Sequence, residues 1–484
     1  DVIRVEDTYY MVSTTMHFMP GCEILQSFDL VHWEHVTYVY ETLDHTDAQQ
    51  LKSGHNIYGQ GMWAASLRYH EGRFYICFVA NDTRKTYLYT SEKIDGPWKK
   101  QLIEGFYHDG SLLFDEDGRN YIVYGNDEIW ITELNEDLTA PKKDGLHRLL
   151  VSDHKNPELG YEGSHIQKIN GYYYIFLVHS LRDRWMRTEA CFYSDSLEGE
   201  FTGGDVLCDD RGYCGQGVAQ GGIVDTPDGK WYAMLFQDSG AVGRIPILLP
   251  VTWKDHFPVF GQNGHVPEEI EVHSTRPGYI YQPLVGSDDF CNGLLPRWQF
   301  NHDPDPRYYH LDALQGTYTI TTREVCTELT QAVNTLTQRM SYPSCAAEVT
   351  VDASALKDGD VAGLCAFQSC YAAVGITKHH GKYEVLMLDK KEDGILDMTE
   401  GTVVESHQMD FRLEADFCNM KDEARCYYRV NKGDWLPIGT VHKLYFKLDH
   451  FTGCRFGLFC YAAEETGGSA CFRDFKYYDV DEIS

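Results

Sequence analysis

The sequence predicts an all-β protein, in which a five-bladed β-propeller precedes a β-sandwich (jelly-roll-like) domain. A hairpin pattern recurs five times in the first half of the chain, and short strand candidates separated by turns follow one another in the second half. No helical pattern lies between the hairpins, which argues against an α/β fold. A β-sandwich in place of the propeller is the alternative fold for the first half.

Each of the five repeats combines a strand, a short turn and a second strand with an aromatic pair. The repeats begin at Asp1, Ser66, Ser111, Ser164 and Gly221, and their turns read ED, EG, EDG, NG and PDG. Acid–Gly and Asn–Gly turns between alternating apolar and polar residues are the strongest local signal for a β-hairpin. We therefore expect a hairpin at the start of each blade.

The spacing of the repeats sets the size of each unit. The last Tyr of each copy lies at Tyr10, Tyr75, Tyr121, Tyr174 and Tyr232, so successive copies are 65, 46, 53 and 58 residues apart. Each unit has room for about four short strands, which is the size of a propeller blade.

The same spacing locates a candidate site. Twelve residues before four of these Tyr residues stand Trp63, Asp109, Glu162 and Gln220, and small residues follow each of them. Because the first strand of a blade starts at the central channel, we expect an indole, two carboxyl groups and an amide to converge at one mouth. The small residues would let the backbone approach a ligand closely. For any one of the four, a satisfied buried polar residue is the alternative interpretation.

Two carboxyl groups that face each other across a pocket suit the cleavage of a glycosidic bond. One donates a proton to the leaving oxygen and the other activates water, while an aromatic ring stacks on the sugar. The sequence shows no nucleophile triad or zinc motif, and the run GQGVAQGG lacks the spacing of a dinucleotide-binding loop. Four histidines are interpreted as hydrogen-bonding groups, so no metal site is predicted from them: His17, His108, His165 and His179.

Length, charge and cysteine content restrict the class of protein further. The chain has 484 residues, enough for two to four domains, and a net charge of −31 that argues against nucleic acid and anionic membrane surfaces as partners. No stretch approaches the 18 apolar residues of a membrane span. The 15 Cys are scattered without a CxxC pair, which indicates reduced thiols and a cytoplasmic location.

Longer motifs around these positions resemble those of a known family. They include DVIRVEDTYYMVSTT, GMWAASLRYHEGRFY, HDGSLLFDEDG, YEGSHIQKINGYYY, AQGGIVDTPDGKWY and GAVGRIPILLPV, and in the second half WQFNHDPDP, NTLTQR and KDGDVAGLCAFQ. With them the chain resembles glycoside hydrolase family 43, the five-bladed β-xylosidases and α-L-arabinofuranosidases, many of which carry a C-terminal β-sandwich. The resemblance covers nearly the whole chain.

The resemblance implies a role for each of four residues. Glu162, in YEGSH, matches the general acid of the family, and Asp109, in HDGS, matches the aspartate that orients the acid and sets its pKa. Arg244, in VGRIP, matches the arginine that binds sugar hydroxyls in the first subsite. Trp63, in MWAAS, matches an aromatic residue of the pocket.

Three further residues are candidates for substrate binding by the same resemblance. Gln220 falls where many relatives place an axial histidine above a central water or calcium ion. The resemblance therefore implies no obligatory cofactor and leaves a central calcium ion open. His17 and Phe18, between STT and MPG, stand where relatives build the rim of the pocket.

The general base is the position at which the chain departs from the family. The family places an aspartate five residues before the arginine of the first hairpin; that arginine is Arg4 here, so the expected base lies two residues upstream of Asp1. We expect the natural chain to carry the base there. The alternatives are Asp1 itself, on the same face of the strand but displaced by about 6–7 Å, and a truncated protein that binds sugar without cleaving it efficiently.

A change in composition near residue 273 separates two domains. The segment HSTRPGYIYQPLVGSDDF has the character of a linker. We predict a propeller over residues 1–275, a linker over 276–287 and a β-sandwich over 288–484. The second domain shows no carboxyl pair, Trp298 and Phe300 are interpreted as core residues, and its expected role is to pack on the propeller.

These observations together predict an exo-acting, inverting glycoside hydrolase that releases xylose or arabinofuranose from xylan-derived oligosaccharides. A small neutral oligosaccharide is the expected partner, whereas nucleic acid and membrane are not expected, and oligomeric state is left open. One alternative is a non-catalytic carbohydrate-binding propeller, and another is an α-L-arabinofuranosidase specific for substituted xylan. Loops around His17, Trp63 and Trp185 would decide between the two sugars.

Overall fold

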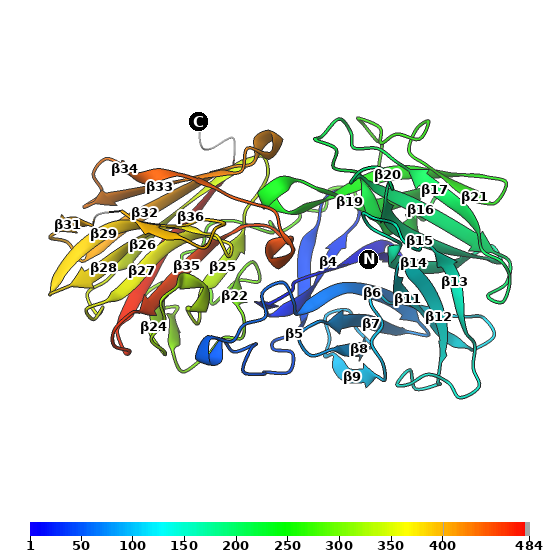
Figure 1. Ribbon diagram of the computed structural model, residues 1–484, viewed down its shortest axis with the longest axis horizontal. Coiled ribbons are helices and arrows are strands. Elements are labelled where there is room, and N and C mark those ends of the chain that lie inside the picture. Colours follow the sequence, from blue (N-terminus) through cyan, green and yellow to red (C-terminus); the bar gives the residue numbers. More distant parts are fainter. Residues whose placement is uncertain (400, 480–484) are drawn as a thin grey trace.

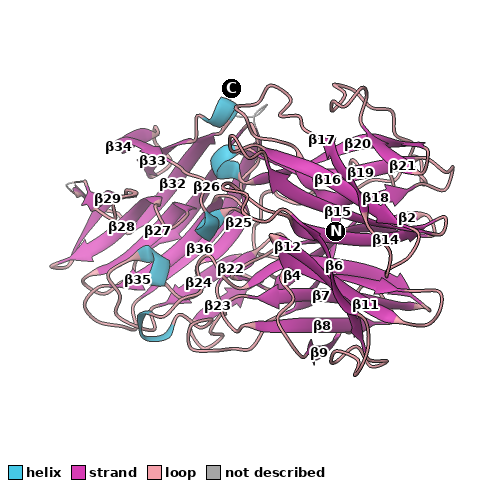
Figure 2. Cartoon of the chain, turned by 45° about the vertical axis from the view of Figure 1, so that its right-hand side comes forward, coloured by secondary structure: helices cyan, strands magenta, loops and turns pink. Residues whose placement is uncertain are grey.

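A computed structural model describes residues 1–399 and 401–479. The two domains lie side by side, with the blades on one side and the sandwich on the other (Figure 1). Strands dominate both domains (Figure 2). Helical structure in the described residues is limited to single 3₁₀ turns: η1 (Lys52–Gly54), η2 (Gly240–Val242), η3 (Leu329–Gln331), η4 (Cys418–Met420) and η5 (Leu448–His450). None of these helices is long or apolar enough to span a membrane.

Five four-stranded antiparallel sheets form the first domain, which confirms the predicted five-bladed propeller. In chain order the blades are β1 (Val2–Val5), β2 (Thr8–Ser13), β4 (Gly21–Ser27) and β5 (Glu34–Tyr40); β6 (Met62–His70), β7 (Arg73–Ala80), β8 (Lys85–Ser91) and β9 (Lys99–Ile103); β10 (Ser111–Phe114), β11 (Asn120–Asn126), β12 (Glu128–Leu134) and β13 (His147–Ser152); β14 (Glu162–Ile169), β15 (Tyr172–Ser180), β16 (Arg187–Ser194) and β17 (Thr202–Leu207); and β18 (Ala219–Asp225), β19 (Trp231–Asp238), β20 (Arg244–Lys254) and β21 (Phe257–Phe260).

The predicted hairpins form at the start of every blade. Glu71–Gly72 joins β6 to β7, and Asn170–Gly171 joins β14 to β15. All four of these turn residues have positive φ, at 48° and 77° in the first turn and 52° and 85° in the second. Positive φ at both central residues is the geometry of the two-residue turn whose twist matches that of the strands it connects.

Apolar contacts between neighbouring blades close the ring. One cluster of buried side chains joins the last blade to the first and contains Tyr9, Met11, Tyr232 and Met234. Comparable clusters lie between each other pair of adjacent blades. An ion pair between Arg4 and Asp225, at 2.5 Å, adds a polar contact to the closure.

Two packed sheets form the second domain. One contains, in spatial order, β3 (Phe18–Met19), β22 (Gln299–Asn301), β25 (Leu336–Arg339), β35 (Arg455–Ala462), β27 (Asp360–Phe367), β28 (Ala372–His379), β29 (Lys382–Lys390) and β30 (Leu396–Met398), with β31 (Thr402–Val404) also paired to β29. The other contains β23 (Tyr309–Asp312), β24 (Thr317–Thr321), β36 (Ser469–Asp479), β26 (Ser344–Asp352), β32 (Gln408–Asp416), β33 (Glu423–Val430) and β34 (Leu436–Lys443).

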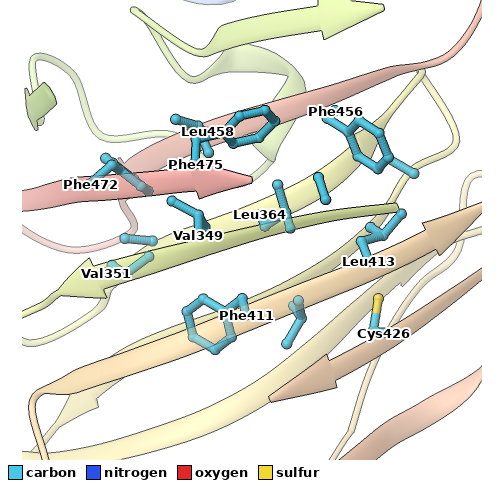
Figure 3. Close-up of a cluster of buried hydrophobic side chains, with 14 of the residues drawn as sticks. Val349, Val351, Leu364, Phe411, Leu413, Cys426, Phe456, Leu458, Phe472 and Phe475 are labelled. Carbon is cyan, nitrogen blue, oxygen red and sulfur yellow. The ribbon is translucent and has the colours of Figure 1, made fainter. Parts of the chain in front are cut away.

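The core of the sandwich lies between these sheets. Side chains such as Val349, Leu364 and Phe411 interdigitate there (Figure 3) and are fully or almost fully buried. Trp298 and Phe300 belong to the same cluster, with exposed fractions of 3% and 6%, which confirms that they are core residues. The predicted sandwich is therefore confirmed.

The two domains share secondary structure. Strand β3 leaves the first blade and pairs with β22, so that Met19 faces Phe300 and Phe18 faces Asn301 across the ladder. The predicted linker packs on the first blade, where the ring of Tyr279 lies 4.5 Å from that of Phe28. The last strand of the propeller ends at Phe260, and the first sandwich strand after it, β22, begins at Gln299. The limits of 1–275, 276–287 and 288–484 for propeller, linker and sandwich stay predictions.

Candidate active site

A cavity of about 510 Å³ lies at the axis of the propeller, where it faces the sandwich domain. Every blade contributes to its wall, and the sandwich domain adds Leu448, Phe451 and Thr452 among others. The structure brings five of the predicted site residues into this cavity: Trp63, Asp109, Glu162, Gln220 and Arg244. Asp1 also reaches its wall, whereas His17 and Phe18 do not line it.

A β-bulge at the head of the first strand recurs in three blades. In β6, β14 and β18, two residues of the first strand oppose a single residue of the second. The pairs on the bulges are Trp63–Ala64, Gly163–Ser164 and Gln220–Gly221. Because a bulge increases the local twist and re-aims side chains, it turns Trp63 and Gln220 out of the regular alternation and into the cavity.

The small residues beside the site serve the packing of the blades. Gly163 has φ +68°, and a Cβ atom there would lie 2.8 Å from Cγ of Gln220 in the next blade. A Cβ atom at Gly221 would lie 2.0 Å from the carbonyl oxygen of Met234. These two glycines are therefore needed for packing, whereas Ala64, Ala65 and Gly221 also line the cavity, where small side chains leave the backbone close to it.

Asp109 and Glu162 lie together with His108 at one side of the cavity. The Nε2 atom of His108 is 3.5 Å from Oε2 of Glu162 and 3.6 Å from Oδ2 of Asp109. Asp109 also accepts a hydrogen bond of 3.0 Å from the backbone N–H of Gly163. Asn126 donates a hydrogen bond of 2.8 Å to the same Oε2 atom of Glu162.

Burial and neighbouring charges separate the proton affinities of these groups. Burial raises the pKa of Asp109, and the His108 imidazolium only partly offsets this. Burial also acts to raise the pKa of Glu162, but His108, Arg187 and Arg244 outweigh it, so that this pKa lies below its ordinary value. Burial acts to lower the pKa of His108, but the two carboxyl groups outweigh it and raise the pKa to about 9.

Two arginines of the cavity wall share one carboxylate. The Nε atoms of Arg187 and Arg244 each lie 3.2 Å from an oxygen of Asp238, whose side chain is almost fully buried. The Arg244 guanidinium is also flanked by the rings of Phe236, at 4.4 Å, and Phe451, at 4.2 Å. Burial lowers the pKa of Arg244 to about 10, which leaves it protonated at neutral pH.

Aromatic side chains from both domains complete the wall. The indole of Trp63 meets the ring of Phe451 edge to face, with centroids 5.9 Å apart. Phe451 follows η5 in the sandwich domain, so that domain closes the cavity beside the indole. Trp185, in the loop between β15 and β16, is 44% exposed on the wall.

The position that the resemblance gives to a central calcium ion does not fit one. The backbone N–H of Gln220 donates to Oε2 of Glu189 at 2.7 Å, and Arg187 lies 3.5 Å from its amide oxygen. Burial raises the pKa of Glu189 well above its usual range, which disfavours the ionised carboxylate that a calcium ion would bind. Calcium prefers six to eight oxygen ligands, which these described residues do not supply. Elsewhere in the described chain, only His108, Asp109 and Glu162 lie close enough to hold an ion, and they already contact one another.

Asp1 lines the cavity wall but is committed to structural contacts. Its Oδ2 atom accepts a hydrogen bond of 2.9 Å from the backbone of Leu67 and pairs with Arg68 at 2.5 Å. Its Oδ1 atom lies 3.1 Å from Nδ1 of His165, and the side chain is only 1% exposed. Asp1 therefore ties the first blade to two others at the axis, and these contacts do not favour it as the base.

The structure places His17 and Phe18 in the contact between the domains, which corrects the expectation that they form the pocket rim. Both side chains are fully buried. The imidazole of His17 packs on the rings of Tyr58 and His450, and the guanidinium of Arg455 lies 3.8 Å above the ring of Phe18. The physical reason is that this loop turns away from the axis to form β3.

Four residues that shape the site escaped the sequence analysis: Asn126, Arg187, Asp238 and Phe451. The repeat locates only the heads of the first strands, whereas Asn126 ends β11, Arg187 begins β16 and Asp238 ends β19. A search for polar residues at the ends of the second and third strands of each blade would have found these three residues. Phe451 comes from the other domain, and no pattern in the sequence connects it to the blades.

Comparisons with known proteins agree with both domains. Residues 1–258 match the family described as Glycosyl hydrolases family 43, and residues 287–478 match the Beta xylosidase C-terminal Concanavalin A-like domain. A beta-xylosidase of Formosa agariphila is 26% identical over 99% of this chain and 87% of its own length. A non-reducing end alpha-L-arabinofuranosidase of Bacteroides ovatus is 25% identical over 65% of this chain and 61% of its own.

A solved structure with a higher sequence identity matches across both domains. It is a bifunctional GH43-CE protein of Bacteroides eggerthii, 42% identical to this chain, with a TM-score of 0.91. The match covers 99% of this chain and 62% of that one. This chain therefore spans less than two thirds of the length of that structure.

Proposed function

The chain belongs to glycosyl hydrolases family 43, and from this premise we propose that it is an exo-acting, inverting glycosidase that releases xylose or arabinofuranose from xylan-derived oligosaccharides. The observation that carries the proposal is the pair of buried Asp109 and partly buried Glu162, which shares one cavity with an indole and two arginines. The names of two relatives, a beta-xylosidase and an alpha-L-arabinofuranosidase, support the choice of sugars.

The shape of the cavity supports attack at a chain end. Five blades surround it, and Leu448 and Phe451 of the sandwich domain close part of its rim. A cavity of about 510 Å³ is within the range of small-ligand sites and encloses a terminal sugar unit. Because the sandwich domain covers part of the mouth, a polysaccharide would enter by its end.

In the proposed reaction Glu162 gives a proton to the leaving glycosidic oxygen. Asp109 orients Glu162 and shares its buried environment, while a second carboxylate on the opposite face of the sugar takes a proton from the attacking water. We propose that this base is the aspartate that the resemblance places two residues before Asp1, because both oxygens of Asp1 are used in structural contacts.

Two side chains would hold the sugar. The Arg244 guanidinium is fixed by Asp238 and by two aromatic rings, which presents its remaining N–H groups to sugar hydroxyls. The indole of Trp63 offers an apolar surface on which a ring can stack. Fixing these groups before the substrate arrives reduces the entropy that binding must overcome.

The expected partner is a small neutral oligosaccharide, in keeping with a net charge of −31. Acid–base hydrolysis of this kind needs no cofactor, and no step of the proposed reaction involves a metal ion. A cytoplasmic location stays a prediction that rests on the cysteines: the described residues contain 15 free thiols, many of them buried.

The proposal is tested with Glu162→Gln in the full-length natural protein. We expect turnover of xylobiose to fall about 10²–10⁴-fold, because its leaving group needs the proton, and turnover of an activated aryl xyloside to fall much less. Glu158→Gln, an exposed change close to β14 in the chain, is the matched control. Comparing 4-nitrophenyl β-xyloside with the α-arabinofuranoside ranks the two sugars.

Unchanged turnover of xylobiose by the Glu162→Gln variant would contradict the assignment of the acid. If the natural protein binds xylose without cleaving any of these substrates, the non-catalytic carbohydrate-binding alternative holds instead.

A further inference from the structure

His108 is a titratable group that the proposed reaction leaves without a role. It lies on the cavity wall, between the two carboxyl groups, and its Nε2 atom is within 3.6 Å of both. The backbone N–H of Gly125 donates a hydrogen bond of 3.0 Å to its carbonyl oxygen, which fixes the segment. An imidazole in this place contacts both the acid and the residue that orients it.

The charges around Glu162 raise the question of where its proton resides. A general acid must be protonated when the substrate is bound, yet three cations, His108, Arg187 and Arg244, favour its ionised form. The carboxyl group of Asp109 is more basic but faces Gly163 and His108. His108 is therefore the group at which a mobile proton is held next to Glu162.

We propose that His108 is the proton store of the site and passes its Nε2 proton to Oε2 of Glu162 as Glu162 protonates the leaving oxygen. This inference rests on the proposed function. Asn126 donates a hydrogen bond to the same Oε2 atom and holds the carboxylate within reach of His108, so the proton that Glu162 receives is the one it then gives to the leaving oxygen.

The step balances without any further reactant. The bond between the anomeric carbon and the leaving oxygen breaks, and a bond between that carbon and the water oxygen forms. The imidazolium proton passes to the ionised Glu162 and from there to the leaving oxygen, so Glu162 ends ionised as it began, and the base gains a proton from water. Solvent then returns the proton from the base to the neutral His108, which restores the site.

The observed distance is compatible with such a transfer. Hydrogen bonds of this type span about 2.7–3.2 Å, so the separation of 3.5 Å has to shorten by about half an ångström. Hydrogen bonds in active sites without substrate are often long and shorten when substrate binds.

The groups that face His108 favour its protonated form. Asp109 and Glu162 act in that direction, and Arg84, whose guanidinium lies on the ring of Phe106 at 4.0 Å, acts against it. The indole of Trp63 lies 6.0 Å away and contributes no charge. Since the two carboxyl groups outweigh Arg84, the proton is retained up to a pH of about 9.

The direction of a pH shift tests the proposal. If His108 supplies the proton, its replacement by Gln leaves Glu162 to hold its own proton, and the alkaline limb of kcat/KM for xylobiose moves to lower pH. If His108 acts only as a charge that favours ionised Glu162, the same variant moves that limb to higher pH. Movement to higher pH, or no movement, would overturn the proposal.

Two further measurements complete the test. We expect the His108→Gln variant to lose about 10²–10³-fold in turnover of xylobiose and less than tenfold with an activated aryl xyloside. His70→Gln, outside this cavity and stacked on Phe114, is the matched control and keeps the wild-type profile. An equal loss with both substrates would contradict a role in proton supply.

Titration of the wild-type imidazole by NMR requires no variant to fold. We expect the His108 ring to lose its proton near pH 9 and at lower pH in the Glu162→Gln variant. Titration near pH 6.5 would overturn the proposal. Loss of activity in Glu162→Gln without these His108 effects would leave the proposed function intact and remove the proton store alone.

Discussion

Asp238 organises the sugar-binding side of the cavity from behind. Its two oxygens lie 3.2 Å from Nε of Arg187 and of Arg244, so one buried carboxylate fixes both guanidinium groups. Without it two cations would stand together in a buried place, where like charges repel more strongly than in water. The residue thus acts on the substrate through its neighbours.

Replacing Asp238 by Asn keeps the size of the side chain and removes the charge that both arginines share. We expect kcat/KM for xylobiose to fall about 10–100-fold, which corresponds to about 1.4–2.7 kcal/mol of lost transition-state binding. Steady-state kinetics measures the loss. Asp205→Asn, at a half-exposed partner of His179 in the same domain, is the control. An unchanged kcat/KM would show that Asp238 does not set the position of Arg244.

Single residues at the site were predictable where the repeat marked them or, for Arg244, where the family resemblance did. Trp63, Asp109, Glu162 and Gln220 share one distance from the tyrosines of their repeats, and the structure brings them into one cavity. Asp238 stands at the end of a different strand, β19, and the sequence around it does not predict that its carboxylate pairs with two arginines. A carboxylate whose partners are remote in the chain has no local signal.

Among the elements, the first strands of the blades were the most predictable. Their turns carry residues that tolerate positive φ, as Asn170 and Gly171 do at 52° and 85°. The bulges at the other ends of β6, β14 and β18 were not visible in the sequence. A bulge depends on which residues of the partner strand pair, and alternation within one strand does not show this.

Gly163 tests whether the bulge in β14 positions the acid. An added methyl group there combines an unfavourable φ of +68° with a contact of 2.8 Å to Gln220, so we expect a loss of about 1–3 kcal/mol in the free energy of unfolding. Activity should fall as well, because Gly163 also donates to Asp109. Chemical denaturation and kinetics measure the two effects.

The control for this change lies in the same blade. Gly171→Ala carries a comparable φ of +85° and has no atom within 4 Å of the added carbon. It should lose stability from the backbone alone and keep its activity. If both variants keep full activity, the bulge does not place the acid.

At the scale of the whole molecule, a cluster of buried histidines joins the two domains. His17 comes from the propeller, and His302 and His450 come from the sandwich; their rings lie 4.9 and 5.3 Å from that of His17. Burial lowers the pKa of His302 to about 3 and that of His450 to about 4, and it lowers the pKa of His17 well below its usual range. All three are therefore neutral in the folded protein at neutral pH.

These depressed pKa values predict loss of stability in acid. In the unfolded chain the histidines bind protons below a pH of about 6.5, whereas in the folded chain they stay neutral, so acid favours unfolding. Above pH 6.5 the depressed pKa of each histidine does not lower the free energy of unfolding. Below pH 6.5 each histidine lowers it by up to about 1.4 kcal/mol per pH unit, until the pH reaches the folded-state pKa of that histidine. Denaturant midpoints between pH 7 and pH 5 measure the slope.

His17→Leu removes one of these groups and should make the stability less dependent on pH over that range. His273→Leu, at an exposed histidine just before the predicted linker, should leave the slope unchanged. Equal slopes in the wild type and the His17→Leu variant would show that the interface does not titrate.

The sequence predicted both domains and their order, yet not how they are joined. The hairpin pattern and the strand candidates of the second half are local, and each is confirmed by the sheets of the structure. The interface is built from His17, Phe18 and residues more than 280 positions later, such as His302. Contacts of this range leave no period or turn signal in the chain.

Strand β3 has a consequence for the modularity of the protein. Because Phe18 and Met19 belong to the edge of a sandwich sheet, the boundary between the domains in space does not coincide with any single cut in the chain. A second domain produced by itself would expose the backbone of β22 as an unpaired edge, which invites other chains to pair with it. Exchange of the second domain between relatives would therefore have to carry the β3 loop with it, as a short donated strand.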